Sequence, residues 1–141
     1  MSSKDPIADF FARRRIAVVG ATDRRDRWGY KIWRYLRDRG HEVFAVNPTV
    51  RTIEGARVFA KLEDIPRPAE GAPPVDAVDL VVNPTVGLEV ARSCGALGIK
   101  SVWAQPGAES FEIAEVCRAS GIDYLEDCVL VQGPGYPPPS A

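Results

Sequence analysis

The sequence has few of the residues from which metal centres and proton-transfer sites are built. Among its 141 residues there is one histidine, His41, and there are three cysteines, at positions 94, 117 and 128. One histidine does not complete a zinc ligand set with cysteines so far apart, and an odd number of cysteines argues against a disulfide framework. We therefore expect no metal site and no disulfide scaffold.

Long apolar runs and an excess of one charge are also missing. No stretch approaches the roughly 20 apolar residues of a membrane helix, and the opening MSSKDPIADFF lacks the basic-then-apolar order of a signal peptide. A formal net charge of -1 offers no general attraction to nucleic acid or to an acidic membrane. We expect a cytoplasmic protein without nucleic-acid or membrane partners, in which any anion site is local.

The residues that are present alternate between short hydrophobic runs and amphipathic segments. Strands buried on both faces are predicted for RIAVVG, HEVFAVNP, VDAVDLVVNP, KSVWAQPG and DYLEDCVLV, and a short edge strand for RVFA. Helices are expected over DPIADFFARR and over residues 29–39, 85–98 and 109–121.

This alternation predicts an α/β protein, a Rossmann-like three-layer sandwich. We expect a mainly parallel sheet of five or six strands in the order 3-2-1-4-5, with helices on both faces. The length fits a single domain over residues 1–141 with a core at about 12–130. The proline-rich end, residues 133–141, is expected to be a flexible tail.

The pentapeptide VNPTV occurs twice, at residues 46–50 and 82–86. In the predicted strand order, both copies end strands that flank the first strand, one on each side. We therefore expect them to form two walls of one crevice at the carboxyl edge of the sheet, where open α/β sheets bind ligands. Asn-Pro is also a frequent strand terminator, so a purely structural explanation stays open.

The loop after the first strand, GATDRRDRWG, has the composition of an anion site. Gly20 lets the backbone approach a phosphate, Thr22 offers a hydroxyl and an amide, and Arg24, Arg25 and Arg27 add positive charge. The alternative is a solvated surface loop. The loop is not the fingerprint Gly-x-Gly-x-x-Gly, and no acidic residue ends the second strand, which disfavours NAD but leaves a phosphorylated ribose open.

Three longer segments resemble a known family. They are IAVVGATDRRDRWGYKIWRYLRDRGHEVFAVNP, VFAKLEDIP and VWAQPGAESFEIAEVCRASGIDYLEDC. Their order and spacing are similar to those of the small bacterial CoA-binding domain proteins, which are related to the N-terminal domain of the succinyl-CoA synthetase α subunit. The resemblance covers about residues 12–130.

The resemblance implies CoA bound at the carboxyl edge of the sheet through its nucleotide and diphosphate. The matching positions are Gly20, Ala21, Thr22, Asn47, Pro48, Asn83, Pro84, Gln105 and Gly107. The ribose 3′-phosphate of CoA would meet Arg24, Arg25 or Arg51, a contact that the resemblance does not place. The chain departs from the family at Val82-Asn83, where a Phe-Arg type of pair is frequent, and at Gln132, where an acidic residue is usual.

Few residues are suited to acid, base or nucleophilic chemistry. His41 begins the second strand at its amino end, opposite the crevice, and we expect it on the surface. Asp79 lies inside a buried strand, either as a base with a raised pKa or, as we favour, as a structural carboxylate bonded to the backbone. Cys94 and Cys117 fall on apolar helix faces, whereas Cys128 is expected near the crevice, within reach of a thiol ligand.

These observations predict non-catalytic binding of CoA or acyl-CoA rather than an enzyme. Two other interpretations stay open, an NAD(P)-dependent oxidoreductase-type Rossmann domain and a ligand-free protein interaction module. Besides CoA, we expect a homodimer or an unidentified protein partner. Trp28 and Tyr30 are candidate exposed aromatics for such a surface, although packing over the sheet explains them equally well.

Overall fold

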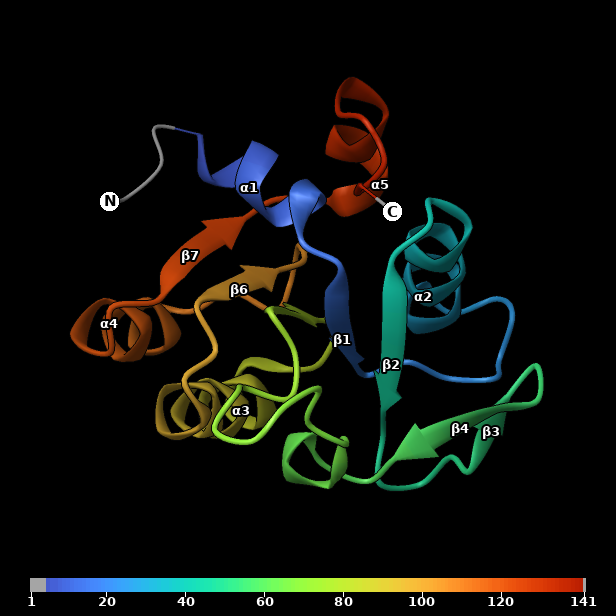
Figure 1. Ribbon diagram of the computed structural model, residues 1–141, viewed down its shortest axis with the longest axis horizontal. Coiled ribbons are helices and arrows are strands. Elements are labelled where there is room, and N and C mark those ends of the chain that lie inside the picture. Colours follow the sequence, from blue (N-terminus) through green and yellow to red (C-terminus); the bar gives the residue numbers. More distant parts are fainter. Residues whose placement is uncertain (1–4, 141) are drawn as a thin grey trace.

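The computed structural model describes residues 5–140, in which one twisted sheet is covered by helices (Figure 1). Its strands are β1 (Arg15–Val19), β2 (Glu42–Val46), β3 (Thr52–Ile53), β4 (Ala56–Phe59), β5 (Ala77–Leu80), β6 (Ser101–Ala104) and β7 (Asp123–Glu126). The strand order is β3-β4-β2-β1-β5-β6-β7, and all neighbours are parallel except the β3–β4 hairpin. The predicted Rossmann-like fold is confirmed, and β3 is an edge strand that the sequence pattern did not indicate.

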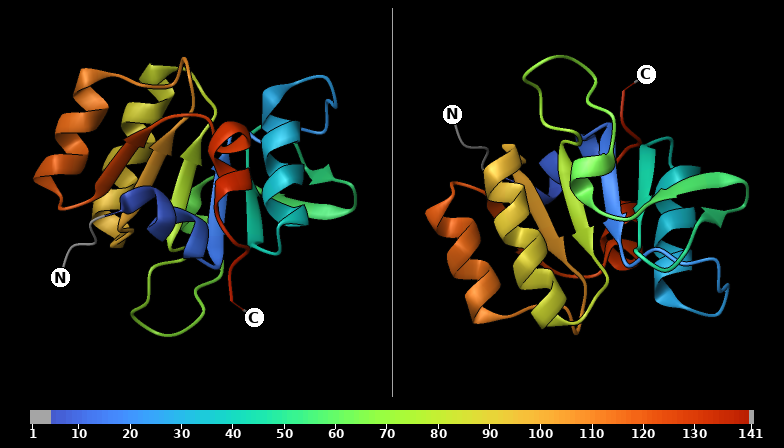
Figure 2. Two further views of the ribbon diagram at one scale, coloured as in Figure 1. Left: turned by 90° about the horizontal axis from the view of Figure 1, so that it is seen from above. Right: turned by 90° about the horizontal axis from the view of Figure 1, so that it is seen from below.

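The helices form a layer on each face of the sheet. α1 (Pro6–Ala12), α2 (Trp28–Asp38) and α5 (Val129–Gln132) cover one face, and α3 (Pro84–Leu97) and α4 (Phe111–Ala119) cover the other (Figure 2). Two short 3₁₀ turns, Leu62–Asp64 and Gly133–Gly135, complete the described elements. None of the helices in this part of the chain is long and apolar enough to span a membrane.

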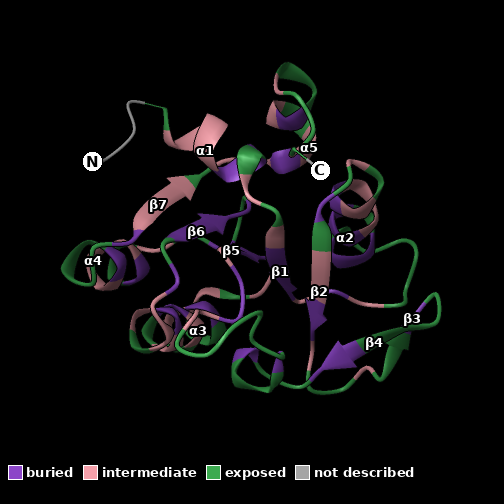
Figure 3. Ribbon diagram, in the orientation of Figure 1, coloured by how far each residue is buried: buried purple, intermediate pink, exposed green. Residues whose placement is uncertain are grey.

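The residues of the central strands β1, β5 and β6 are buried along almost their whole length (Figure 3). In β1, Ile16 and Val18 join the core under α2, whereas Ala17 and Val19 join the core under α3. This alternation follows from the two-residue period of a strand. Each large side chain that is fully buried in this way contributes about 1.5–3 kcal/mol to the free energy of unfolding.

The last strand is shorter than the sequence predicts. β7 ends at Glu126 instead of continuing through Cys128, and α5 follows it. The change of direction is fixed by Asp127, whose Oδ1 accepts a hydrogen bond from the Cys128 amide at 2.7 Å. The hydrophobic run DYLEDCVLV therefore contains both a strand and a helical turn, because a short apolar run has no period that separates the two.

The C-terminal segment packs against the domain, contrary to the expectation of a flexible tail. The Arg39 guanidinium donates hydrogen bonds to the carbonyl oxygens of Gly133, at 2.9 Å, and of Pro137, at 2.8 Å. The Tyr136 ring stacks on the Phe11 ring with 5.4 Å between centroids. Proline-rich backbone leaves its carbonyl groups unpaired, and a guanidinium with its several donors can satisfy them.

Candidate functional site

Gly20, which follows β1, lies between the ends of the two neighbouring strands. Its amide donates to the Val46 carbonyl at 2.9 Å, and one residue earlier the Val19 carbonyl accepts from the Val81 amide at 2.8 Å. The φ of Gly20 is +101°, and a Cβ atom there would lie 2.1 Å from the Val81 carbonyl oxygen. Only glycine fits this position. Both VNPTV copies therefore border the loop after β1.

The first copy forms one wall of a pocket of about 550 Å³, which we call the Asn47 pocket. Asn47 Nδ2 donates to the Ala21 carbonyl at 2.9 Å, and Asn47 Oδ1 accepts from the Thr49 amide at 3.0 Å. The same pocket is lined by Val19, Gly20, Val46, Pro48, Ala60, Lys61, Leu62, Glu63, Val82, Val86, Glu89, Val90 and Ser93. The side chain of Asn47 thus ties the end of β2 to the loop that follows β1.

The second copy begins a helix. Asn83 is the N-cap of α3, where its Oδ1 accepts from the Val86 amide at 3.0 Å, and Pro84 is the first helical residue. Thr85, where the sequence predicts the helix to begin, already lies inside the helix. Proline is favoured at this first position because its missing amide would have no partner there.

A second pocket, the loop pocket, lies at the amino end of α2. It measures about 420 Å³ and is lined by Gly20, Thr22, Arg24, Arg27, Trp28, Gly29 and Val81. The N-cap residue of α2, Arg27, makes no side-chain capping bond, so the first amides of the helix are not satisfied in that way. The positive end of the helix dipole and two arginines make this pocket suitable for an anion.

Two predicted arginines lie outside these pockets. Arg25 is drawn towards the β3–β4 hairpin, where its guanidinium lies 3.9 Å from Glu54 Oε2 and 5.5 Å from the centre of the Tyr30 ring. Glu54 also accepts a hydrogen bond from Tyr30, and this bond is the main cause of a lowered pKa of Glu54. Arg51 is exposed and lines none of the three pockets described here.

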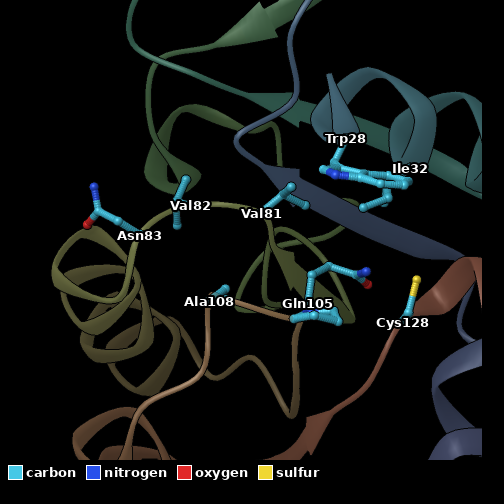
Figure 4. A pocket seen from close by; sticks show the side chains of 10 residues that line it. Trp28, Ile32, Val81, Val82, Asn83, Gln105, Ala108 and Cys128 are labelled. Atoms are coloured by element: carbon cyan, nitrogen blue, oxygen red, sulfur yellow. The ribbon is translucent and has the colours of Figure 1, made fainter. Parts of the chain in front are cut away.

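The third pocket, the Gln105 pocket, lies between α2 and the loop after β6 (Figure 4). It measures about 440 Å³ and is lined by Trp28, Ile32, Val81, Val82, Asn83, Gln105, Pro106, Gly107, Ala108 and Cys128. Its walls are mainly apolar. The side-chain amide of Gln105 points towards Cys128 across the pocket, and its Oε1 accepts from the Val129 amide at 3.1 Å.

The structure thus places nine of the predicted residues at or beside one groove. Gly20, Thr22, Arg24, Asn47, Pro48, Asn83, Gln105 and Gly107 line pockets, and the buried Ala21 holds Asn47. Sequence reasoning did not include Ile32, Lys61, Val81 and Val82 in the site. Their side chains are those of ordinary helix, loop and strand residues, and only the order of the strands brings them to one edge.

His41 is buried, not on the surface as expected. Its Nδ1 lies 2.7 Å from the Arg13 carbonyl oxygen, its exposed fraction is 4%, and burial lowers its pKa. It precedes β2, at the strand end opposite the pockets. The expected core positions of Cys94 and Cys117 are confirmed, and burial raises the pKa of Cys117 to about 11.

Asp79 is the residue that differs most from its prediction. It lies in the middle of β5 between Val18 and Trp103 on the adjacent strands, and it is fully buried. Neither carboxyl oxygen has a hydrogen-bond partner among the described residues, so the expected bonds to the backbone are absent. Desolvation raises the pKa of Asp79 well above its ordinary value, which favours a neutral carboxylic acid.

The fold and these pockets define a Rossmann-like domain whose crevice lies at the carboxyl edge, where the strand order reverses about β1. Within that class, the chain belongs to the family described as the CoA binding domain, whose model matches residues 14–134. The resemblance predicted from the sequence is confirmed.

Known relatives support the same assignment. The uncharacterized protein YneT of Bacillus subtilis is 30% identical over 131 residues, which cover 92% of this chain and 93% of that protein. The alpha subunit of an ADP-forming acetate–CoA ligase of Pyrococcus furiosus is 29% identical over 94 residues, 66% of this chain but 19% of that subunit. The solved structure of a conserved hypothetical protein from Pyrococcus furiosus superposes with a TM-score of 0.76 at 37% identity, covering 84% of this chain and 98% of that one.

Proposed function

We propose that the protein binds CoA or an acyl-CoA in the groove around Gly20 and catalyses no reaction on it. The observation that carries this proposal is that the three pockets adjoin one another through shared lining residues. The Asn47 and loop pockets share Gly20, the loop and Gln105 pockets share Trp28 and Val81, and Val82 lines both outer pockets. A long ligand whose central part is anionic fits this row of pockets, in which the loop pocket with its arginines adjoins the Asn47 pocket and the Gln105 pocket.

The Asn47 pocket suits the adenosine part of the ligand. Leu62, Val82 and Val86 supply apolar walls for a base, and Asn47 and Thr49 border its polar side. Lys61 is the cationic residue of this lining, and we assign it to the ribose 3′-phosphate. Arg51 does not line the pocket and Arg25 is engaged by Glu54, so neither is favoured for this contact.

The loop pocket suits the diphosphate. Backbone at Gly20 can approach a phosphate closely, and Arg24 and Arg27 lie beside it. The positive end of the α2 dipole contributes only about 0.3–1 kcal/mol, so the two guanidinium groups supply most of the attraction. The mainly apolar Gln105 pocket then receives the pantetheine arm. It shares Trp28 and Val81 with the loop pocket.

The alternative of a dinucleotide-dependent oxidoreductase finds less support. A ribose diol would need a carboxylate at the end of β2, but Asn47 stands there. Its side-chain amide donates to the Ala21 carbonyl and accepts from the Thr49 amide. Family membership and the ligase relative also favour CoA. We further propose a cytoplasmic protein that forms a homodimer or binds a protein partner.

Isothermal titration with CoA, acetyl-CoA, NAD and NADP tests the proposal. We expect heat of binding with CoA and acetyl-CoA and none with NAD. Binding of NADP but not CoA would favour the oxidoreductase, and heat with none of the four would favour an interaction module. Acetyl-CoA incubated with the protein is expected to stay intact, and enzyme-dependent loss of the thioester would contradict a non-catalytic role.

A further inference from the structure

Gln105 is buried, yet only one end of its side-chain amide is paired. Its exposed fraction is 4%, and its Oε1 accepts from the Val129 amide at 3.1 Å. Because an N–H must face an oxygen, this bond fixes which way the amide is turned. Nε2 is left on the side of the pocket, where it donates to no acceptor among the described residues. Nε2 is not one of the fully buried polar atoms, so it is open to the pocket, and an occupant with a carbonyl group can accept a hydrogen bond from it.

Cys128 lines the same pocket, opposite Gln105 (Figure 4). Its backbone is fixed on both sides, since its amide donates to Asp127 Oδ1 at 2.7 Å and its carbonyl accepts from the Gln132 amide at 3.0 Å. Cys128 is half-buried, whereas Cys94 and Cys117 lie in the core under α3 and α4. It is the cysteine that a ligand in the groove can reach.

The pantetheine arm of CoA has the groups that this pocket lacks. It carries amide carbonyls and ends in a sulfur atom. If the diphosphate lies in the loop pocket, the arm passes Trp28 and Val81, which line both pockets, and a carbonyl can accept from Gln105 Nε2. The terminal sulfur is then directed to the end of the pocket where Cys128 lies.

We propose that Cys128 forms a reversible mixed disulfide with CoA, using CoA disulfide as the reactant. The inference rests on the proposed CoA binding and adds a covalent redox state to it. The Cys128 thiol loses its proton to solvent, and its thiolate attacks one sulfur of CoA disulfide. A sulfur–sulfur bond to CoA forms, the original sulfur–sulfur bond breaks, and a second CoA leaves as a thiolate that takes up a proton. No other oxidant is needed.

Intact-mass measurement after incubation with CoA disulfide tests this reaction. We expect one CoA adduct per chain, removed by reductant, absent in Cys128→Ser and retained in Cys94→Ser and Cys117→Ser. Glutathione disulfide, which has the same reactive bond but no nucleotide, should react at least about tenfold more slowly, as directed binding predicts. Equal rates with the two disulfides, or an adduct that survives in Cys128→Ser, would overturn the proposal.

A matched pair of side-chain amides in the same pocket tests the part played by Gln105. Gln105→Glu keeps an oxygen for the Val129 amide but removes the donor, whereas Asn83→Asp adds the same charge to the pocket and keeps the oxygen that caps α3. Gln105→Glu should slow the reaction with CoA disulfide about tenfold relative to Asn83→Asp, the effect of one lost hydrogen bond. Equal rates in the two variants would contradict this role.

Titration of CoA under reducing conditions separates the two proposals. If CoA binds to the parent and to Cys128→Ser but no adduct forms with CoA disulfide, the mixed disulfide is wrong and the proposed function stands. If CoA does not bind to either protein, the proposed function fails, and the disulfide proposal fails with it.

Discussion

The two VNPTV copies have the same sequence and different structures. In the first, Asn47 Oδ1 accepts from the amide two residues ahead and the chain turns towards the β3–β4 hairpin. In the second, Asn83 Oδ1 accepts from the amide three residues ahead and α3 begins. Both asparagines end a strand by binding a nearby amide, as Asn does in turns and at N-caps. The following residues decide the outcome, RTIEGARV for the hairpin and GLEVARSC for the helix.

The two asparagines differ in what the side-chain nitrogen, Nδ2, binds. Asn47 Nδ2 crosses to the Ala21 carbonyl and so holds the loop after β1, whereas Asn83 Nδ2 makes no corresponding bond among the described residues. In both copies, therefore, Asn Oδ1 ends a strand by accepting from a nearby amide. Only in the first copy does Nδ2 also hold another segment, the loop after β1. The first copy supports the ligand loop directly, and the second does so by starting α3 beside it.

The largest effect is expected at Gly20, which separates the two copies. Gly20→Ala places a Cβ atom 2.1 Å from the Val81 carbonyl at a φ of +101°, and it should lower the free energy of unfolding by about 2–4 kcal/mol and abolish CoA binding. Gly40→Ala is the matched control, because Gly40 has a φ of +102° but no atom within 4 Å of the added Cβ. Chemical denaturation of both variants measures the difference, and equal losses would contradict the clash.

The strands that lead into the two copies differ at the positions paired with Val18, which are Ala45 in β2 and Asp79 in β5. Burial raises the pKa of Asp79, so the folded state keeps a proton that the unfolded chain releases near pH 4. The stabilisation is complete below that pH and is lost as pH rises towards the folded pKa. The free energy of unfolding should fall by about 1.4 kcal/mol per pH unit in this window.

Asp79→Asn removes the titration at nearly constant shape. Denaturant midpoints measured from pH 4 to 7 should show the parent losing stability relative to Asp79→Asn as pH rises. A difference between parent and variant that stays constant over this range would mean that the Asp79 carboxyl titrates normally in the fold, and it would contradict the unpaired environment seen in β5.

An identical substitution in each copy tests their different roles. Asp caps helices as well as Asn does, so Asn83→Asp should change the free energy of unfolding by less than about 0.5 kcal/mol. Asn47→Asp loses the donor to the Ala21 carbonyl and places a charge beside it, at an expected cost of about 1–3 kcal/mol and with weaker CoA binding. Thermal unfolding and titration distinguish the two, and the reverse order of effects would refute the assignment.

The last prediction concerns ligand preference and the cation beside the Asn47 pocket, Lys61. The parent should prefer CoA over dephospho-CoA by about 1–3 kcal/mol, because the 3′-phosphate adds charge that a local cation rewards. Lys61→Ala should remove most of this preference, whereas Arg25→Ala and Arg51→Ala should keep it. Paired titrations at matched salt provide the measurement. No preference in the parent would contradict a 3′-phosphate contact.

The sequence predicts the strands, the helices and the strand order, because hydrophobic runs and glycines are visible locally and the rules for parallel sheets are general. The crevice and Gly20 follow from those rules. The ion pair of Arg25 with Glu54 and the packing of the C-terminal segment against Arg39 depend on contacts between distant segments. The helical turn after Cys128 lies in a short apolar run, which has no period that separates a strand from a helix. Asp79 was assigned partners because buried carboxylates usually have them, and no local pattern signals that they are missing.

Amide chemical-shift mapping during a CoA titration tests the central claim most directly, that one ligand spans all three pockets. The account predicts saturable changes at Gly20, Thr22, Asn47 and Gln105 in the same titration, with the β3–β4 hairpin tip at Glu54 as an unaffected reference. Changes confined to one pocket, changes centred on the hairpin, or no changes at saturating CoA would contradict it.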